Sequence, residues 1–229
     1  AYEKNDPEIV RRSSMLQKSR IFKEMFLFSL ILEELAAMPA PKRLLEAGCG
    51  IGTMTPMFRA LAESVVAFDL SEAGINNAKS NNKDIGGIFF CVADGTQPMA
   101  YSEIAAGGFD VIVFREFHPF TRDLYGTAES AQNVHKAILA EYARLLTPGG
   151  VMLITHAESK DQVICPEECG LSDRLDMIIR RVDPRLAAAF LFLTRNRIRW
   201  AMKLAKLFQP LLWLVSSKNV LYVLRKRSD

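Results

Sequence analysis

A short glycine-rich segment, Gly48–Gly52 (GCGIG), restricts the fold of this chain more than any other feature. It follows the run Arg43–Ala47 (RLLEA), which is expected to form a short buried strand, and Thr55 with Pro56 is expected to cap and begin a helix over residues 56–63. Glycine lets the backbone turn sharply and approach a ligand closely, and the N-terminus of a helix is electropositive. A buried strand that enters a helix in this way predicts an α/β fold with a ligand site at the turn.

Four more apolar runs follow the glycine-rich segment, and helical patterns separate them. The runs cover residues 65–68, 88–92, 109–114 and 151–155, and the clearest helical pattern covers residues 130–146. Strands that are apolar throughout and alternate with helices predict a parallel sheet with both faces covered. We therefore predict an α/β protein with a doubly wound, Rossmann-like sheet.

Two acidic residues near the glycines limit the kind of ligand. Asp69 ends the second run, about 20 residues after the glycines, where a carboxylate can accept hydrogen bonds from a ribose diol. Glu46 stands two residues before Gly48, and Thr53 occupies the position of the third glycine of a dinucleotide fingerprint. A carboxylate at position 46 repels a pyrophosphate and attracts an ammonium or sulfonium group. The pattern favours a cationic nucleoside and opposes a nicotinamide-dependent oxidoreductase.

Five motifs in order resemble those of the class I S-adenosylmethionine (SAM)-dependent methyltransferases. They are Leu45–Gly52 (LEAGCGIG), Ala67–Ser71 (AFDLS), Val92–Gly95 (VADG), Phe109–Phe114 (FDVIVF) and Leu145–Gly150 (LLTPGG). The resemblance covers about residues 42–156. It implies a seven-stranded, mostly parallel sheet with an antiparallel last strand, SAM as cofactor and S-adenosylhomocysteine as product.

The same resemblance implies roles for individual residues. The glycine loop holds the methionine part of SAM, Asp69 binds the ribose hydroxyls, and Asp94 contacts the adenine amino group. Arg115 and Glu116 border the site of methyl transfer. The residues expected to bind the cofactor are Glu46, Gly48, Cys49, Gly50, Gly52, Asp69, Leu70, Asp94, Gly95 and Arg115.

An oxygen acceptor usually requires a base that removes its proton. His118 is the first candidate for a catalytic base, because imidazole titrates near neutral pH and the residue follows the fourth run; Glu116 is the second. The alternative is that His118, beside Pro119, only orders its loop. No metal site is expected, because the spacing of Cys165 and Cys169 does not match that of a zinc site.

The segment after the fourth run, Arg115–Phe120 (REFHPF), excludes some acceptors. Enzymes that methylate the amino group of adenine or cytosine share an Asn/Asp-Pro-Pro-aromatic string there, and protein-arginine methyltransferases share a loop with two glutamates. Neither motif is present in this sequence. We expect a small-molecule, sugar or lipid-like acceptor, methylated at oxygen. The alternatives are an RNA methyltransferase and a catalytically inactive SAM-binding protein that docks on a membrane or partner.

The chain of 229 residues is 49% hydrophobic, which is ample material for one core. Residues 8–38 show a helical pattern, and we expect residues 1–41 to form an N-terminal helical lid, as in many relatives. Residues 42–156 form the SAM-binding core. Residues 157–229 add to the same domain a basic helical insertion, largely helical over residues 174–210, and a final strand at residues 219–224.

The net charge of +3 is unevenly distributed, since residues 174–227 carry 13 basic and two acidic residues. On a helical wheel Arg195, Arg199, Lys203 and Lys206 lie within about 80° of one another, opposite an apolar side. Such a face is either solvated, or contacts anionic lipid, or binds an anionic acceptor; few aromatic residues are interleaved with the cations, which argues against nucleic acid. Since no signal sequence begins the chain, we expect a cytoplasmic protein with peripheral contact at the inner membrane surface.

Overall fold

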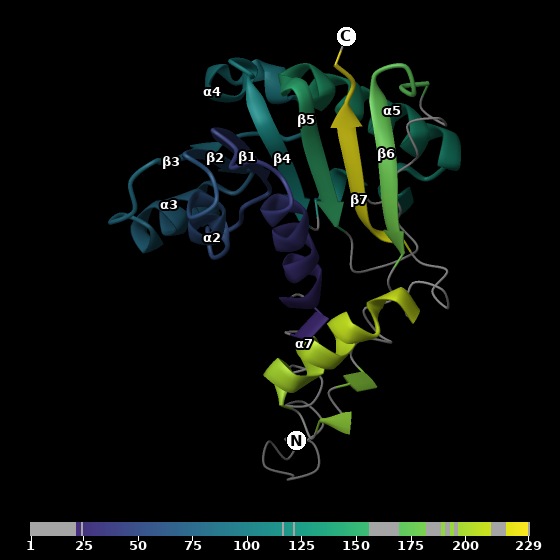
Figure 1. Ribbon diagram of the computed structural model, residues 1–229. Coiled ribbons are helices and arrows are strands. Elements are labelled where there is room, and N and C mark those ends of the chain that lie inside the picture. Colours follow the sequence, from purple (N-terminus) through teal and green to yellow (C-terminus); the bar gives the residue numbers. More distant parts are fainter. Residues whose placement is uncertain are drawn as a thin grey trace, which may run out of the picture.

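The computed structural model has a seven-stranded sheet at its centre, in the order β3-β2-β1-β4-β5-β7-β6 (Figure 1). The structure describes residues 22–23, 25–115, 117–120, 122–155, 170–181, 189–190, 193–194, 197–211 and 219–228. The strands are β1 (Arg43–Ala47), β2 (Ser64–Asp69), β3 (Ile88–Val92), β4 (Phe109–Arg115), β5 (Leu146–Thr155), β6 (Leu175–Arg181) and β7 (Asn219–Lys226). Neighbours among β1 to β5 are parallel, whereas β7 is antiparallel to both β5 and β6. The predicted Rossmann-like sheet with an antiparallel last strand is confirmed.

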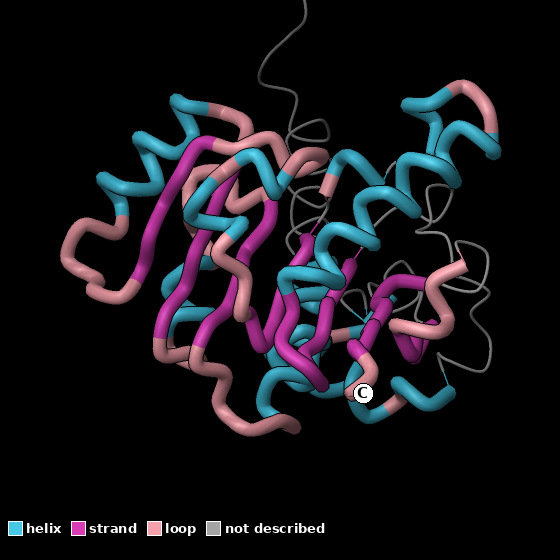
Figure 2. The backbone as a smooth tube through the Cα atoms, turned by 90° about the horizontal axis from the view of Figure 1, so that it is seen from above, coloured by secondary structure: helices cyan, strands magenta, loops and turns pink. Residues whose placement is uncertain are grey.

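The helices connect the strands and cover both faces of the sheet (Figure 2). They are α2 (Thr55–Arg59), α3 (Glu72–Asn81), α4 (Ser102–Ala105), α5 (Ala128–Leu145) and α7 (Ile198–Leu207), with short 3-10 turns η1 (Pro98–Ala100), η2 (His118–Phe120) and η3 (Arg122–Tyr125). Residues 25–36 form a further helix, here called the N-terminal helix. None of the helices in the described part of the chain is long and apolar enough to cross a membrane.

Two buried clusters lie on opposite faces of the sheet. The first joins Phe26 and Ile31 of the N-terminal helix and Ala201 of α7 to strand residues such as Val113. The second joins Tyr142 of α5 to alternate strand residues and to the aromatic side chains that follow β4. The N-terminal helix is therefore part of the core in its described residues, while residues 1–21 of the expected lid lie outside the description. Helix α7 packs in the same cluster through Ala201, and it lies beyond the carboxyl ends of the parallel strands (Figure 1).

The expected helical insertion is wrong at its beginning, because residues 175–181 form the edge strand β6. They pair with β7 from Leu175 opposite Lys226 onwards. Leu175 is buried, whereas Ile178 is 52% exposed. Leu175, Ile178 and Ile179 fall at the spacing i, i+3, i+4, so this sequence also fits the apolar side of a helix. The helical prediction holds at α7.

Candidate functional site

A cavity of about 370 Å³ opens where the carboxyl ends of β1, β2 and β3 meet the segment after β4. Ligands bind at this edge in open parallel sheets. Six of the residues expected from the sequence line the cavity: Gly48, Asp69, Leu70, Asp94, Gly95 and His118. The fold thus brings together residues from four separate segments of the chain.

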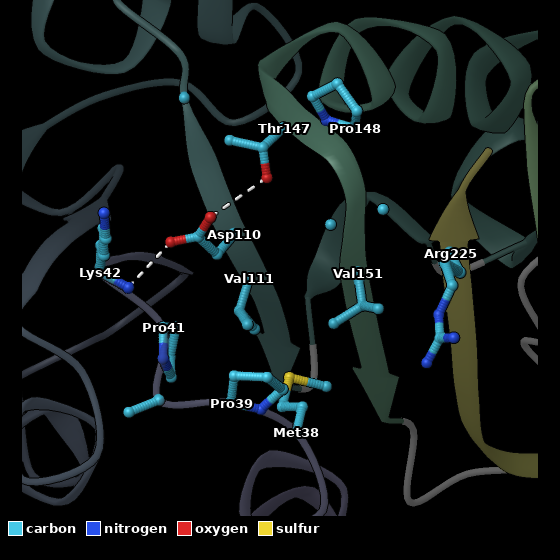
Figure 3. Close-up of a pocket in the computed structure, with 14 residues that line it drawn as sticks. Met38, Pro39, Pro41, Lys42, Asp110, Val111, Thr147, Pro148, Val151 and Arg225 are labelled. Atoms are coloured by element: carbon cyan, nitrogen blue, oxygen red, sulfur yellow. Dashed lines mark hydrogen bonds between the residues drawn. The ribbon is translucent and has the colours of Figure 1, made fainter. Parts of the chain in front are cut away.

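A larger depression of about 670 Å³ lies at the opposite edge, between the amino ends of β1, β4 and β5 (Figure 3). Its main acidic group, Asp110, already accepts hydrogen bonds from the backbone N–H of Lys42 at 2.8 Å and of Arg43 at 3.1 Å. The hydroxyl of Thr147 donates to the same carboxylate at 3.2 Å. Asp110 therefore ties three chain segments together, and we assign the depression a structural origin.

The carboxylate of Asp69 is fixed by two backbone groups. The N–H of Gly50 donates to Oδ2 at 2.9 Å, and the N–H of Ser71 donates to Oδ1 at 2.9 Å. Gly48 and Gly50 have φ angles of 76° and 56°, which favour glycine, and these angles turn the loop toward the end of β2. Each carboxylate oxygen can accept more than one hydrogen bond, so Asp69 is held rigidly and still suits a ribose diol.

Asp94 follows β3 and lines the same cavity. Its Oδ1 accepts hydrogen bonds from both the N–H and the hydroxyl of Thr96, at 2.9 and 2.7 Å. Within the described residues this arrangement leaves Oδ2 to accept a hydrogen bond from a ligand amino group. Leu70, which is 72% exposed, provides an apolar surface beside it. The acidic and apolar groups together match a nucleoside with a diol, an amino group and a flat base, so the residues present fit SAM.

Phe117 forms the inner wall of the cavity. Its ring packs on Phe114 and Phe120, at centroid distances of 5.1 and 5.4 Å. A Cβ atom added to Gly95 would lie 2.4 Å from Cζ of Phe117, so only glycine permits this approach. The hydroxyl of Tyr142 donates to the carbonyl oxygen of Gly95 at 3.0 Å and holds the loop in place. The aromatic wall fixes the start of the segment that carries His118, whose own side chain is exposed at the cavity.

Glu46 lies beneath the glycine loop and is only 2% exposed. The hydroxyl of Thr55 donates to Oε2 of Glu46 at 2.6 Å, so Thr55 is not the helix cap expected from the sequence; Met54 occupies that position. Burial raises the pKa of Glu46 from 4.5 to about 7, although the Thr55 hydrogen bond and the charge of Arg115 lower it. A cationic group bound nearby would favour the ionised carboxylate.

Arg115 and Thr155 form a second polar group at the ends of β4 and β5. They are register partners, and Glu46 pairs with the residue two positions before Arg115, so all three side chains project from one face of the sheet. Nε of Arg115 and Oγ1 of Thr155 are buried, and neither has a hydrogen-bond partner among the described residues. Buried polar atoms of this kind are uncommon and cost free energy. Neither residue lines the cavity, and Thr155 is fully buried.

Replacement of Thr155 by valine is expected to raise the free energy of unfolding by about 1 kcal/mol, because the change removes a buried hydroxyl that has no partner among the described residues and keeps the shape of the side chain. Urea denaturation measures the difference. Thr155→Ser, which keeps the hydroxyl and loses the methyl group, serves as the control and should be less stable than the wild type. A loss of stability in Thr155→Val would show that the hydroxyl is hydrogen-bonded in solution.

The remaining expected residues have supporting positions or are not described. A Cβ on Gly52 would lie 2.8 Å from Nδ2 of Asn82, so this glycine allows α3 to pack closely. Cys49 is buried, which raises the pKa of its thiol. Glu116 lies outside the described residues, as do His156, Cys165 and Cys169. Tyr125 also lines the cavity, and its hydroxyl donates to the carbonyl oxygen of Pro119 at 2.7 Å. The sequence did not single out Thr96, Tyr125 or Thr155; only Thr96, two residues after Asp94, had a local signal, that of an Asx-type turn.

Comparisons with known proteins agree with this geometry. A family model described as "Methyltransferase domain" matches residues 40–202, which is more than half of the chain. The N-methyltransferase NodS from Bradyrhizobium japonicum WM9 is similar in structure, with a TM-score of 0.56 and 16% identity over 91% of this chain and 97% of that chain. Its complex with S-adenosyl-L-homocysteine gives a TM-score of 0.51 and 16% identity over 99% of this chain and 90% of that chain.

A further solved structure, StiE O-MT, has a TM-score of 0.55 and 16% identity over 97% of this chain and 78% of that chain. At these identities the likeness establishes the fold. No curated protein sequence matches this chain.

Proposed function

Because the chain belongs to the methyltransferase domain family, we propose that it transfers the methyl group of SAM to an oxygen atom of a small or amphiphilic acceptor. The observation that carries the choice of oxygen is the exposed imidazole of His118 at the wall of the cavity that contains Asp69 and Asp94. An alcohol or phenol requires removal of a proton, and imidazole is the side chain most often used for that. The similar structures include both an N-methyltransferase and an O-MT, so the fold alone leaves the acceptor atom open.

Different side chains have different roles in such a reaction. SAM supplies a methyl group on a positively charged sulfonium. Asp69 and Asp94 hold the nucleoside, and Phe117 excludes water from the inner wall. Glu46, whose pKa lies near neutrality, provides negative charge near the glycine loop when it is ionised. The protein thereby aligns donor and acceptor, and His118 accepts the proton of the acceptor hydroxyl.

Replacement of His118 by glutamine is expected to lower kcat by about 100-fold or more, with little change in the KM for SAM, because the change removes the base and leaves the nucleoside contacts intact. Steady-state kinetics with both substrates varied gives the two constants. In His118→Gly, added imidazole should restore part of the activity. An unchanged kcat would assign His118 to loop structure only.

The acceptor class is tested by incubating the protein with methyl-labelled SAM and lysate fractions of small molecules, lipids and RNA. We expect label in the small-molecule or lipid fraction. Label in RNA alone would favour the RNA methyltransferase. Tight SAM binding with no transfer to any fraction would favour an inactive SAM-binding protein.

A further inference from the structure

Helix α7 packs with one side on the N-terminal helix. Ala201 and Ala205 are fully buried in the same apolar cluster as Phe22 and Phe26. Lys206 forms an ion pair with Glu33 of the N-terminal helix at 2.7 Å. The predicted apolar side of α7 is thus largely used inside the protein, and the orientation of the helix is fixed by these contacts.

The outer face of α7, defined here as Arg199, Trp200, Lys203 and Leu207, is exposed. Trp200 is 56% exposed and Leu207 71% exposed, and the nearby Leu193 and Leu211 are 73% and 55% exposed. Large apolar side chains gathered on one face are unusual on a surface that remains in water. In the described part of the chain Lys203 has no acidic partner; its Nζ lies 5.1 Å from the centroid of the Trp200 ring.

The chain segment that carries this face has charge of one sign only. Residues 184–218 contain seven basic residues and no acidic residue. A hollow of about 340 Å³ beside the outer face is lined by Leu193, Thr194, Arg197 and Trp200. The hollow suits a phosphate group that is attached to an acyl chain. The guanidinium of Arg197 can pair with the phosphate, and Trp200 and Leu193 can contact the acyl chain.

We propose that the outer face of α7 docks on the surface of an anionic lipid bilayer. Its cations attract the phosphate headgroups, and Trp200 and Leu207 enter the boundary between headgroups and acyl chains. Because α7 lies beyond the carboxyl ends of the parallel strands (Figure 1), docking turns the cavity edge of the sheet toward the lipid. The proposal concerns peripheral contact and is independent of the acceptor.

Vesicle flotation tests the docking. The wild type should float with vesicles of phosphatidylcholine and phosphatidylglycerol and remain unbound with phosphatidylcholine alone. The variant Arg199→Glu/Lys203→Glu should bind the anionic vesicles at least about tenfold more weakly. Lys79→Glu/Lys83→Glu, which makes the same charge change on exposed residues of and after α3, should bind like the wild type. Thermal unfolding of each variant checks that it is folded.

A second measurement reports on Trp200 directly and needs no charge reversal. The chain has two tryptophans, so Trp213→Phe leaves Trp200 as the single tryptophan, which can be excited selectively at wavelengths that tyrosine does not absorb. Anionic vesicles should shift its emission to shorter wavelength, and brominated lipids should quench it. Equal flotation of wild type and the α7 variant, no flotation by either, or an unshifted emission would overturn the proposal. The proposal would also be overturned if the wild type does not bind vesicles but forms a dimer or binds RNA, and the α7 variant loses that dimer or that RNA binding.

Discussion

Replacement of Asp69 by alanine is expected to weaken SAM binding by at least about 100-fold. The carboxylate offers two acceptors to the ribose diol, and each hydrogen bond to a charged group contributes about 1.5–3 kcal/mol. The same side chain accepts from the N–H groups of Gly50 and Ser71, so its removal also loosens the glycine loop. Calorimetric titration with SAM measures the affinity directly.

The control for this experiment is Asp84→Ala, which removes an exposed carboxylate after α3. It should bind SAM like the wild type, and so exclude a general effect of net charge. Asp69→Asn should lie between the two, because the amide keeps one acceptor and loses the charge. If Asp69→Ala binds SAM as tightly as the wild type, the nucleoside does not lie against β2.

The second large effect concerns Glu46 and the pH dependence of stability. Below pH 4.5 the carboxyl is protonated in both the folded and the unfolded chain, so it has no effect. Between pH 4.5 and about 7 the unfolded chain loses this proton first, which lowers the free energy of unfolding as the pH rises. The raised pKa corresponds to a loss of about 3 kcal/mol in the free energy of unfolding, and this loss is complete above about pH 7. Glu46→Gln should therefore be more stable than the wild type at pH 8, by up to about 3 kcal/mol.

Urea denaturation of the protein without cofactor, from pH 4 to pH 8, measures this difference. The two proteins should agree most closely near pH 4 and diverge as the pH rises. Glu63→Gln, at an exposed glutamate before β2, should follow the wild type throughout. Parallel curves for Glu46→Gln and the wild type would mean that Glu46 is already ionised in the folded protein at neutral pH.

The central part of the fold could be predicted from the sequence because its strands are buried on both faces. Leu44 and Leu45 of β1 and Val111–Phe114 of β4 are apolar, and glycine or polar residues mark where such strands end. Those same ends form the cavity, so Asp69 and Asp94 could be placed from their positions after β2 and β3. The edge of the sheet that binds a ligand can therefore be predicted where sequence motifs mark the end of each strand.

Other features depend on contacts between distant segments and leave no local signal. In the edge strand β6, Leu175, Ile178 and Ile179 have the spacing of a helix, and only the pairing with β7 shows that the segment is a strand. Thr55 has the sequence of a helix cap, yet the buried carboxylate of Glu46 competes successfully for its hydroxyl. The approach of Phe117 to Gly95 joins the segments after β4 and β3, and only the folded chain reveals it.

The most direct test of the central claim is a calorimetric titration of one protein preparation with SAM and, separately, with NADH. The glycine loop, Glu46 and the acidic groups at the ends of β2 and β3 predict binding of one SAM per chain, with no heat of binding from NADH. Tight binding of NADH without binding of SAM would contradict the account.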